Sequence, residues 1–128
     1  MIVRPAREQD VPAIQAIVEA CGLAADGIDY TKWTGIMLVA VRQSEVVGFL
    51  QCLPARPYAV VTEIGVLPQH QKGRACHELI KGLELILRGQ GVTAWTGYVG
   101  HHRGLEALLS HAGAKSTGDG SMYIRSLA

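Results

Sequence analysis

Residues 58–87 read YAVVTEIGVLPQHQKGRACHELIKGLELIL, and this segment decides the predicted fold. It opens with a run, Tyr58–Leu67, that is apolar apart from Thr62 and Glu63. Such a run is typical of a strand at the centre of a sheet that is covered on both faces. Over Ala75–Arg88 apolar residues return at helical spacing, which indicates a helix. The segment therefore predicts a strand, a short loop and a helix.

The loop between this strand and this helix carries cationic side chains. It contains Lys72, Gly73 and Arg74 just before the first helical residues. Backbone N–H groups at a helix start lack partners, and the helix dipole there favours an anion. The loop has a single glycine, however, where phosphate-binding loops usually have two or three. The residues alone leave two interpretations open, a phosphate site and a tight turn without a ligand.

The rest of the chain alternates between strand and helix patterns. Further strands are expected at Ile2–Arg4, Met37–Arg42, Val46–Leu53, Val92–Val99 and Ser121–Leu127. Further helices are expected from Val11 to Cys21, with Asp10 as a cap, and at His102–His111, while residues 23–35 stay ambiguous and include an optional short helix near Ile28–Trp33. This order predicts one α+β domain over residues 1–128, with helices on both faces of a mixed, mostly antiparallel sheet.

Composition and charge exclude several classes of protein. The 128 residues suffice for one domain, and 48% apolar with 18% charged residues is typical of a globular chain. A net charge of +1, scattered basic residues and 5% aromatics argue against nucleic-acid binding. The chain shows neither a signal peptide nor an apolar run long enough to span a membrane. Three cysteines without a CxxC motif favour reduced thiols, so we expect a cytoplasmic protein.

Four local sequences, in this order, resemble the GNAT superfamily of N-acetyltransferases over almost the whole chain. They are IVRPAREQDVPAI (2–14), MLVAVRQSEVVGFLQC (37–52), TEIGVLPQHQKGRACHELIKGLE (62–84) and HHRGLEALLSHAGA (101–114). The third is similar to the fourth strand, pyrophosphate loop and following helix of these enzymes. The resemblance implies a GNAT-like domain that uses acetyl-CoA as co-substrate.

The resemblance also implies where acetyl-CoA binds. The expected coenzyme-binding residues are Ile64, Val66, Gln71, Lys72, Gly73, Arg74, Ala75 and Cys76. The family's loop reads Q/R-x-x-G-x-G/A, because small residues let the pyrophosphate oxygens approach the backbone. In one alignment Gln71 takes the first position, and Arg74 and Cys76 stand where small residues are expected.

A second alignment of the loop matches the two small positions instead. It places Gly73 and Ala75 there, but it begins at His70 and puts Glu78 where leucine is usual. The first alignment suits the apolar positions of the helix better, including Leu79. We prefer it for the helix and leave the alignment of the loop open.

Glu63 is the carboxylate that the resemblance offers as a catalytic base. An amine must be neutral to attack a thioester, so a base near the acetyl group helps. Strand alternation puts Glu63 on the face opposite to Thr62, and a bulge would change which of the two faces the substrate. The alternative role is a solvated charge, or one paired with Arg56.

The general acid is harder to place. In the family it is a tyrosine of the last helix, but that position falls on Leu109 if Gly113 matches the usual glycine. Tyr98, at the end of the fifth strand, is another candidate acid, and its alternative role is packing. His102 takes the family's asparagine position, where the resemblance implies a hydrogen bond to the pantetheine arm, and histidine is a common general acid. It is equally compatible with an exposed histidine at a helix start.

One cysteine and two histidines are candidates for thiol chemistry and for metal binding. Cys76, at a helix start, is a candidate for a lowered pKa, although no base pairs with it. His70 and His77 lack an evident third ligand, so we expect no metal site.

Two functions follow from these residues. The first is an acetyl-CoA-dependent N-acetyltransferase that acts on an unidentified small-molecule or protein amine through a ternary complex. Residues 23–35 would line the acceptor site, where Asp26, Asp29 and Glu63 would attract a cationic amine. The second is a weak or inactive GNAT-fold module that binds other components of an assembly. Homo-oligomer formation is compatible with either.

Overall fold

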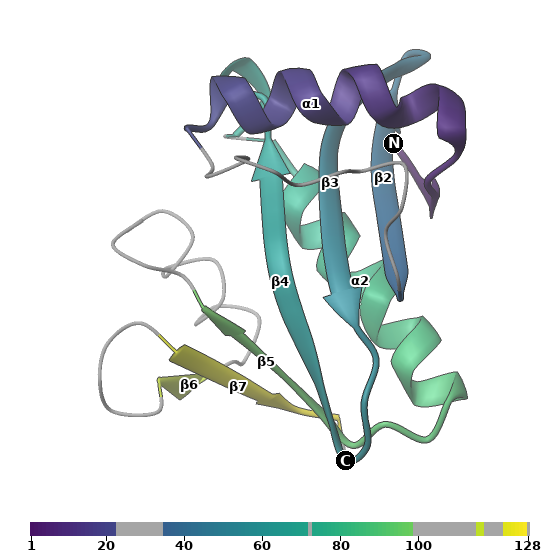
Figure 1. The fold of residues 1–128 in the computed structure, drawn as a ribbon, viewed down its shortest axis with the longest axis vertical. Coiled ribbons are helices and arrows are strands. Elements are labelled where there is room, and N and C mark those ends of the chain that lie inside the picture. Colours follow the sequence, from purple (N-terminus) through teal and green to yellow (C-terminus); the bar gives the residue numbers. More distant parts are fainter. Residues whose placement is uncertain (23–34, 72, 99–114, 117–121, 128) are drawn as a thin grey trace.

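A computed structural model of the chain describes residues 1–22, 35–71, 73–98, 115–116 and 122–127. Seven strands form one sheet in the order β1-β2-β3-β4-β5-β7-β6 (Figure 1). The strands are β1 Ile2–Pro5, β2 Ile36–Arg42, β3 Glu45–Leu53, β4 Tyr58–Val66, β5 Ala94–Tyr98, β6 Lys115–Ser116 and β7 Met122–Ser126. Neighbouring strands are antiparallel except for β4 and β5, which are parallel. This confirms the predicted α+β fold with a mixed, mostly antiparallel sheet.

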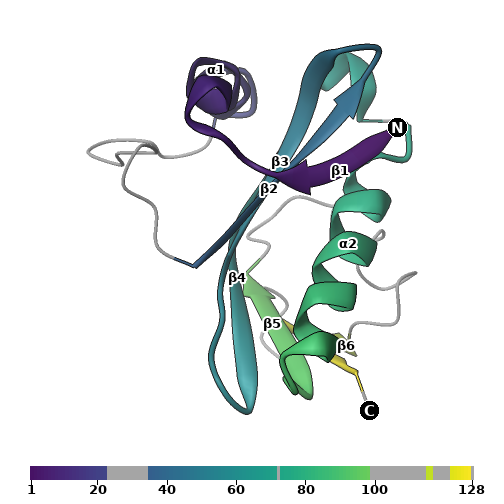
Figure 2. The same cartoon turned by 90° about the vertical axis from the view of Figure 1, so that its right-hand side faces the viewer.

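Two helices cover opposite faces of the sheet (Figure 2). They are α1, Val11–Ala20, and α2, Ala75–Gly89. The buried residues on the α1 side are Val11, Ile14, Ile17, Val18, Met37, Val39 and Phe49. On the α2 side they include Leu38, Leu50, Cys52, Ala59, Leu79, Leu83, Leu87 and Trp95. The apolar stripes predicted for both helices therefore face the sheet, and each helix builds its own core.

A glycine permits the start of α2 to lie close to the sheet. A Cβ atom added to Gly48 in β3 would lie 3.1 Å from the carbonyl oxygen of Gly65 and 3.3 Å from Cδ1 of Leu79. Both distances are tighter than ordinary contacts, so a side chain there would push β4 and α2 outwards. Gly48, which follows Val47 in β3, thus has a packing role.

The expectation that β4 is covered on both faces is wrong for its first half. Tyr58 and Val60 keep 51% and 39% of their surface exposed. Helix α1 crosses the other end of the sheet and does not cover the start of β4 (Figure 1). An apolar run in a sequence cannot show where along a strand a helix crosses it.

The remaining expectations differ in detail. Strand β6 and two short 3₁₀ turns, Glu8–Asp10 and Pro68–His70, were not predicted. The helix expected at His102–His111 and the optional helix near Ile28–Trp33 lie outside the described residues.

Asp10 stands at the expected N-cap position of α1, but its side chain does not cap the helix. Its carboxylate accepts two hydrogen bonds from the Arg4 guanidinium, at 2.7 and 3.0 Å, and one from the backbone N–H of Arg7 at 2.7 Å. The side-chain bond from Arg4 is the main reason why the pKa of Asp10 lies below its ordinary value. Asp10 therefore fastens the end of β1 to the turn before α1.

Neither α1 nor α2, nor any other helix in the described part of the chain, is long and apolar enough to cross a membrane.

Candidate functional site

The candidate site lies where β4 and β5 separate. The two strands pair only between Tyr58–Val61 and Ala94–Gly97. After Val61, β4 continues to Val66 beside β3 alone, and Figure 1 shows the two strands moving apart. We call this place the divergence point. Within the described residues, the edge of β4 beyond it has no strand partner, so it presents backbone N–H and C=O groups to a ligand.

A β-bulge at Thr62 stands at the divergence point. Cys52 of β3 lies opposite Val61 and Gln51 lies opposite Glu63, so Thr62 is the extra residue. The single proton of the Thr62 hydroxyl is shared between two acceptors of Gln51, the backbone oxygen at 3.3 Å and the side-chain oxygen at 3.1 Å. These bonds fix the bulge against β3.

The bulge decides which face Glu63 occupies. Val61 packs on the α2 side, so uninterrupted alternation would also place Glu63 on that side. Because Thr62 is inserted, Glu63 lies opposite Gln51, on the same face as Phe49 and α1. Glu63 is partly exposed there. The carboxylate is thus kept out of the α2-side core and placed next to the divergence point.

Ile64 and Val66 pack their side chains into the core between β4 and α2. These two side chains are therefore not available to a ligand. The carbonyl oxygen of Val66 accepts hydrogen bonds from the Cys21 thiol and the Gln71 side-chain amide, both at 3.1 Å. One oxygen thus joins the end of α1, the end of β4 and the loop. Sequence reasoning missed Cys21, because its partner is 45 residues away along the chain.

The loop winds into α2 through short turns. The N–H of His70 donates to Leu67 at 2.8 Å, and the N–H of Gly73 donates to His70 at 3.0 Å. The first bond of helical type runs from the N–H of Glu78 to the carbonyl of Arg74 at 2.9 Å, and no side chain caps the helix. N–H groups in the first turn of α2 have no partner within the helix, which makes this terminus suitable for an anion.

The side chains at the two expected small positions differ in direction. Cys76 packs against the α2-side core, and burial raises the pKa of its thiol to about 12. The expectation of a lowered pKa is therefore wrong, since desolvation outweighs the helix dipole. Arg74 is exposed, and a nitrogen of its guanidinium lies 3.5 Å from Oε1 of Glu78, one turn along the helix. Gly73 is also exposed, and an added Cβ would lie 3.3 Å from the His70 oxygen. Cys76 thus leaves the solvent side of the loop open.

Several predicted site residues lie outside the described part of the chain, and for one of them the backbone alone is described. For Tyr98 the structure places the backbone, which pairs with Met122 of β7 at the end of β5. Lys72, His102, Leu109 and the segment around Asp26 and Asp29 lie outside the described residues. The structure therefore places Glu63 and the loop in succession along the chain beyond the divergence point, but it does not decide the general acid.

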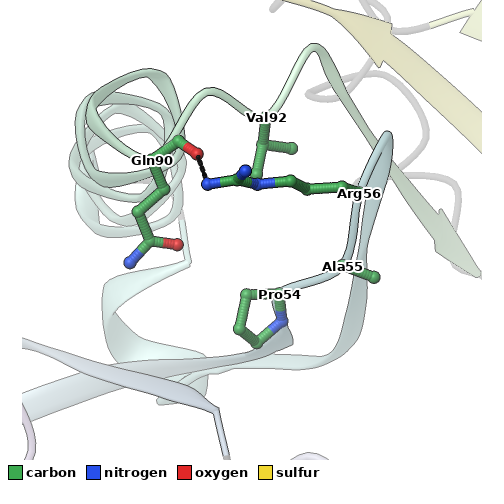
Figure 3. Close-up of a pocket in the computed structure, with 5 residues that line it drawn as sticks. All are labelled: Pro54, Ala55, Arg56, Gln90 and Val92. Carbon is green, nitrogen blue, oxygen red and sulfur yellow. Dashed lines mark hydrogen bonds between the residues drawn. The ribbon is translucent and has the colours of Figure 1, made fainter.

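A pocket of about 210 Å³ lies elsewhere on the molecule. It is lined by Pro54, Ala55, Arg56, Gln90 and Val92, between the β3–β4 turn and the end of α2 (Figure 3). Arg56 reaches across it and donates a hydrogen bond to the backbone oxygen of Gln90 at 2.7 Å. Since Arg56 precedes β4 while the loop follows it, this pocket and the loop lie at different ends of the strand.

The described cysteines, and the described residues of the types that bind metals, show neither a disulfide nor a metal-binding group. All three cysteines are free, and burial also raises the pKa of Cys52, to about 11. In the ranges that the structure describes, no three His, Cys, Asp or Glu side chains are grouped to hold a metal ion.

The chain is similar to known proteins both in sequence pattern and in fold. A scan against models of protein families matches residues 7–111 to the acetyltransferase (GNAT) family. A search of curated proteins finds no significant match.

The fold is also similar to solved structures. Ard1 from Thermoplasma volcanium has 16% identity and a TM-score of 0.80, over 99% of this chain and 97% of that one. A GNAT family acetyltransferase from Brucella melitensis in complex with acetyl-CoA has 20% identity and a TM-score of 0.74, over 99% and 88%. A ribosomal-protein-alanine N-acetyltransferase from Brucella melitensis has 18% identity and a TM-score of 0.78, over 98% and 99%. At these identities the likeness shows the fold.

Proposed function

The chain belongs to the acetyltransferase (GNAT) family, and from this premise we propose that it transfers the acetyl group of acetyl-CoA to an amine. Both substrates would be bound together, so that the amine attacks the thioester carbonyl directly. Much of the rate would come from holding the two reactants in contact. A similar acetyltransferase from Brucella melitensis was solved with acetyl-CoA, which supports acetyl-CoA as the acetyl donor.

The unpaired edge of β4 beyond the divergence point carries this proposal. The pantetheine arm of coenzyme A is extended and contains amide groups, so it can pair with a free strand edge as another strand would. This edge ends at Val66, and the loop that follows leads into the uncapped start of α2. A molecule that lies along the edge would place its pyrophosphate at the helix start, where N–H groups favour an anion.

The first alignment of the loop agrees better with these contacts. Gln71 at its first position is anchored to Val66, and Cys76 at its last position points into the core. The phosphate would therefore meet backbone N–H groups and the exposed Arg74 rather than the thiol. Lys72 and Arg74 would supply the positive charge near the pyrophosphate.

Glu63 is the proposed base. It follows the bulge at Thr62 and lies on the α1 side of β4, in the part of the strand whose edge would bind pantetheine. It would take the proton of the incoming ammonium group, directly or through water. Tyr98 and His102 are the proposed donors for the leaving thiolate, and backbone N–H groups would polarise the thioester carbonyl.

Calorimetry and an activity assay test the proposal. Acetyl-CoA titrated into the purified chain should bind with a saturable isotherm, and the release of coenzyme A thiol should depend on an added amine from a panel of small amines and peptide N-termini. Binding without amine-dependent thiol release would favour the second function, a GNAT-fold module that has lost catalysis. A chain that fails to bind acetyl-CoA at millimolar concentration would refute the proposal.

A further inference from the structure

Glu84 is a buried acidic residue with no role in the proposed reaction. It lies in the middle of α2 and is only 8% exposed, next to the fully buried Leu83. One of its oxygens, Oε2, accepts a hydrogen bond from the indole N–H of Trp95 at 2.7 Å and another from Nε of Arg125 at 3.2 Å. Trp95 belongs to β5 and Arg125 to β7, and the two are directly opposite each other in the sheet. A single carboxylate oxygen on α2 thus binds both strands.

Burial of this carboxylate is costly. A charge taken out of water is tolerated only when it is paired and hydrogen-bonded, and an apolar side chain at such a position is often as stabilising. The bonds of Glu84 therefore give little reason to expect a net gain in stability over a leucine. They do impose one fixed distance between the helix and the two strands, which an apolar contact would not.

This fixed distance matters because the second half of the sheet joins the first through one strand pairing and the apolar packing of Trp95. Helix α2 packs against β1, β2, β3 and β4, so these elements form one unit. Strand β5 joins that unit along β4 by only four residue pairs. The strands β7 and β6 follow from β5. Glu84 is a direct polar tie between the first unit and the strands that lead away from it.

We propose that Glu84 is a positioning residue that holds β5 and β7 against α2 and thereby fixes how far β5 departs from β4. The inference rests on the proposed function in one respect: acetyl-CoA would lie at the divergence point, so the tie would set its affinity. Glu84 itself does not touch the coenzyme in this account. It acts through the placement of β5.

Three variants separate positioning from general stability. Glu84→Gln keeps an acceptor for Trp95 but removes the charge that holds Arg125. Arg125→Met removes the hydrogen bond and ion pair that Arg125 of β7 makes with Glu84. Arg4→Met is the matched control, since it breaks the Arg4–Asp10 ion pair, which is also largely buried but joins β1 to the turn before α1.

Hydrogen exchange without ligand is the first measurement. Glu84→Gln and Arg125→Met should accelerate exchange of the β5 and β7 amides and leave β2 and β3 unchanged. The control should not affect β5 or β7. This arm tests the tie even if the chain binds no coenzyme.

Acetyl-CoA affinity is the second measurement. Glu84→Gln and Arg125→Met should each weaken binding by about tenfold, and the double variant should be no weaker than Glu84→Gln alone. Arg4→Met should bind as the unaltered chain does. Equal exchange in β5 and β2, or equal loss of affinity in the control, would overturn the inference. A lack of binding by the unaltered chain would instead refute the proposed function, and the exchange result would still decide the role of Glu84.

Discussion

The two halves of β4 have different partners. From Tyr58 to Val61 the strand is paired with β3 on one edge and with β5 on the other, whereas from Thr62 to Val66 its one strand partner within the described residues is β3. The first half joins the two parts of the sheet, and the second half forms the edge at the candidate site. Within one strand, pairing serves the fold, and its interruption would serve the proposed binding. Substitutions in the two halves should therefore affect different quantities.

The largest expected effect is a loss of stability in the paired half. Trp95 faces Ala59 across the β4–β5 pairing and is 1% exposed. Trp95→Ala removes the largest fully buried side chain of the described residues, so it should lower the free energy of unfolding by about 3–5 kcal/mol in urea denaturation. Leu85→Ala, at an exposed position of α2, is the control and should change it by less than about 0.5 kcal/mol. Similar losses of unfolding free energy for both variants would mean that the paired half of β4 does not contribute more to stability than the exposed face of α2.

The next effect belongs to the unpaired half and should appear in catalysis. Glu63→Gln should lower kcat by about 10²- to 10⁴-fold, because the amide cannot take a proton from the amine. The low-pH limb of the kcat/KM profile should disappear with it, while the melting temperature stays close to that of the unaltered chain. Glu19→Gln, on the exposed side of α1, provides the control. A large drop in melting temperature without loss of the pH limb would make Glu63 a structural residue.

A third substitution, far from the divergence point, should change stability and its pH dependence only. The pKa of Asp10 is lowered by Arg4, so its contribution to stability is present above its unfolded-state pKa and is lost as pH falls through the folded-state value. Asp10→Asn should therefore cost about 1–3 kcal/mol near neutral pH, and the difference should shrink below about pH 4. Denaturation curves over this range measure it. A changed KM for acetyl-CoA would show that the two regions are not independent.

The smallest effect concerns the exposed Arg74. Arg74→Ala should raise the KM for acetyl-CoA by about two- to fivefold, since it removes one solvated charge beside the pyrophosphate and leaves the backbone N–H groups in place. High salt should reduce the difference between the variant and the unaltered chain. Arg88→Ala, in the last turn of the same helix, should leave KM unchanged. An equal rise for both variants would indicate a general charge effect.

The sequence predicted the elements well where a periodic pattern determines them. The stripe through Leu79 and Leu83 indicated α2, and its buried residues follow that stripe. The strand pattern after Tyr58 indicated β4 to within one residue of its end. Local patterns sufficed because these residues take their structure from the burial of one face.

The site was less predictable because its geometry depends on distant pairing. The face that Glu63 occupies depends on a bulge, which only the register with Gln51 reveals. The burial of Glu84 depends on Trp95 and Arg125, which lie on later strands. A single polar residue near an apolar stripe gave no signal of either partner.

The shared carbonyl of Val66 has a consequence for how each of the two proposed ligands affects the binding of the other. Gln71, in the loop between β4 and α2, and Cys21, at the end of α1, both donate hydrogen bonds to this oxygen, so the loop and the helix are connected through it. The segment expected to line the acceptor site starts directly after that helix. A shift of the loop on occupation by acetyl-CoA would thus move the first residues of the acceptor side. Thermodynamic linkage then requires the coupling to be reciprocal, so a bound amine would change the affinity for acetyl-CoA by the same factor as acetyl-CoA changes the affinity for the amine.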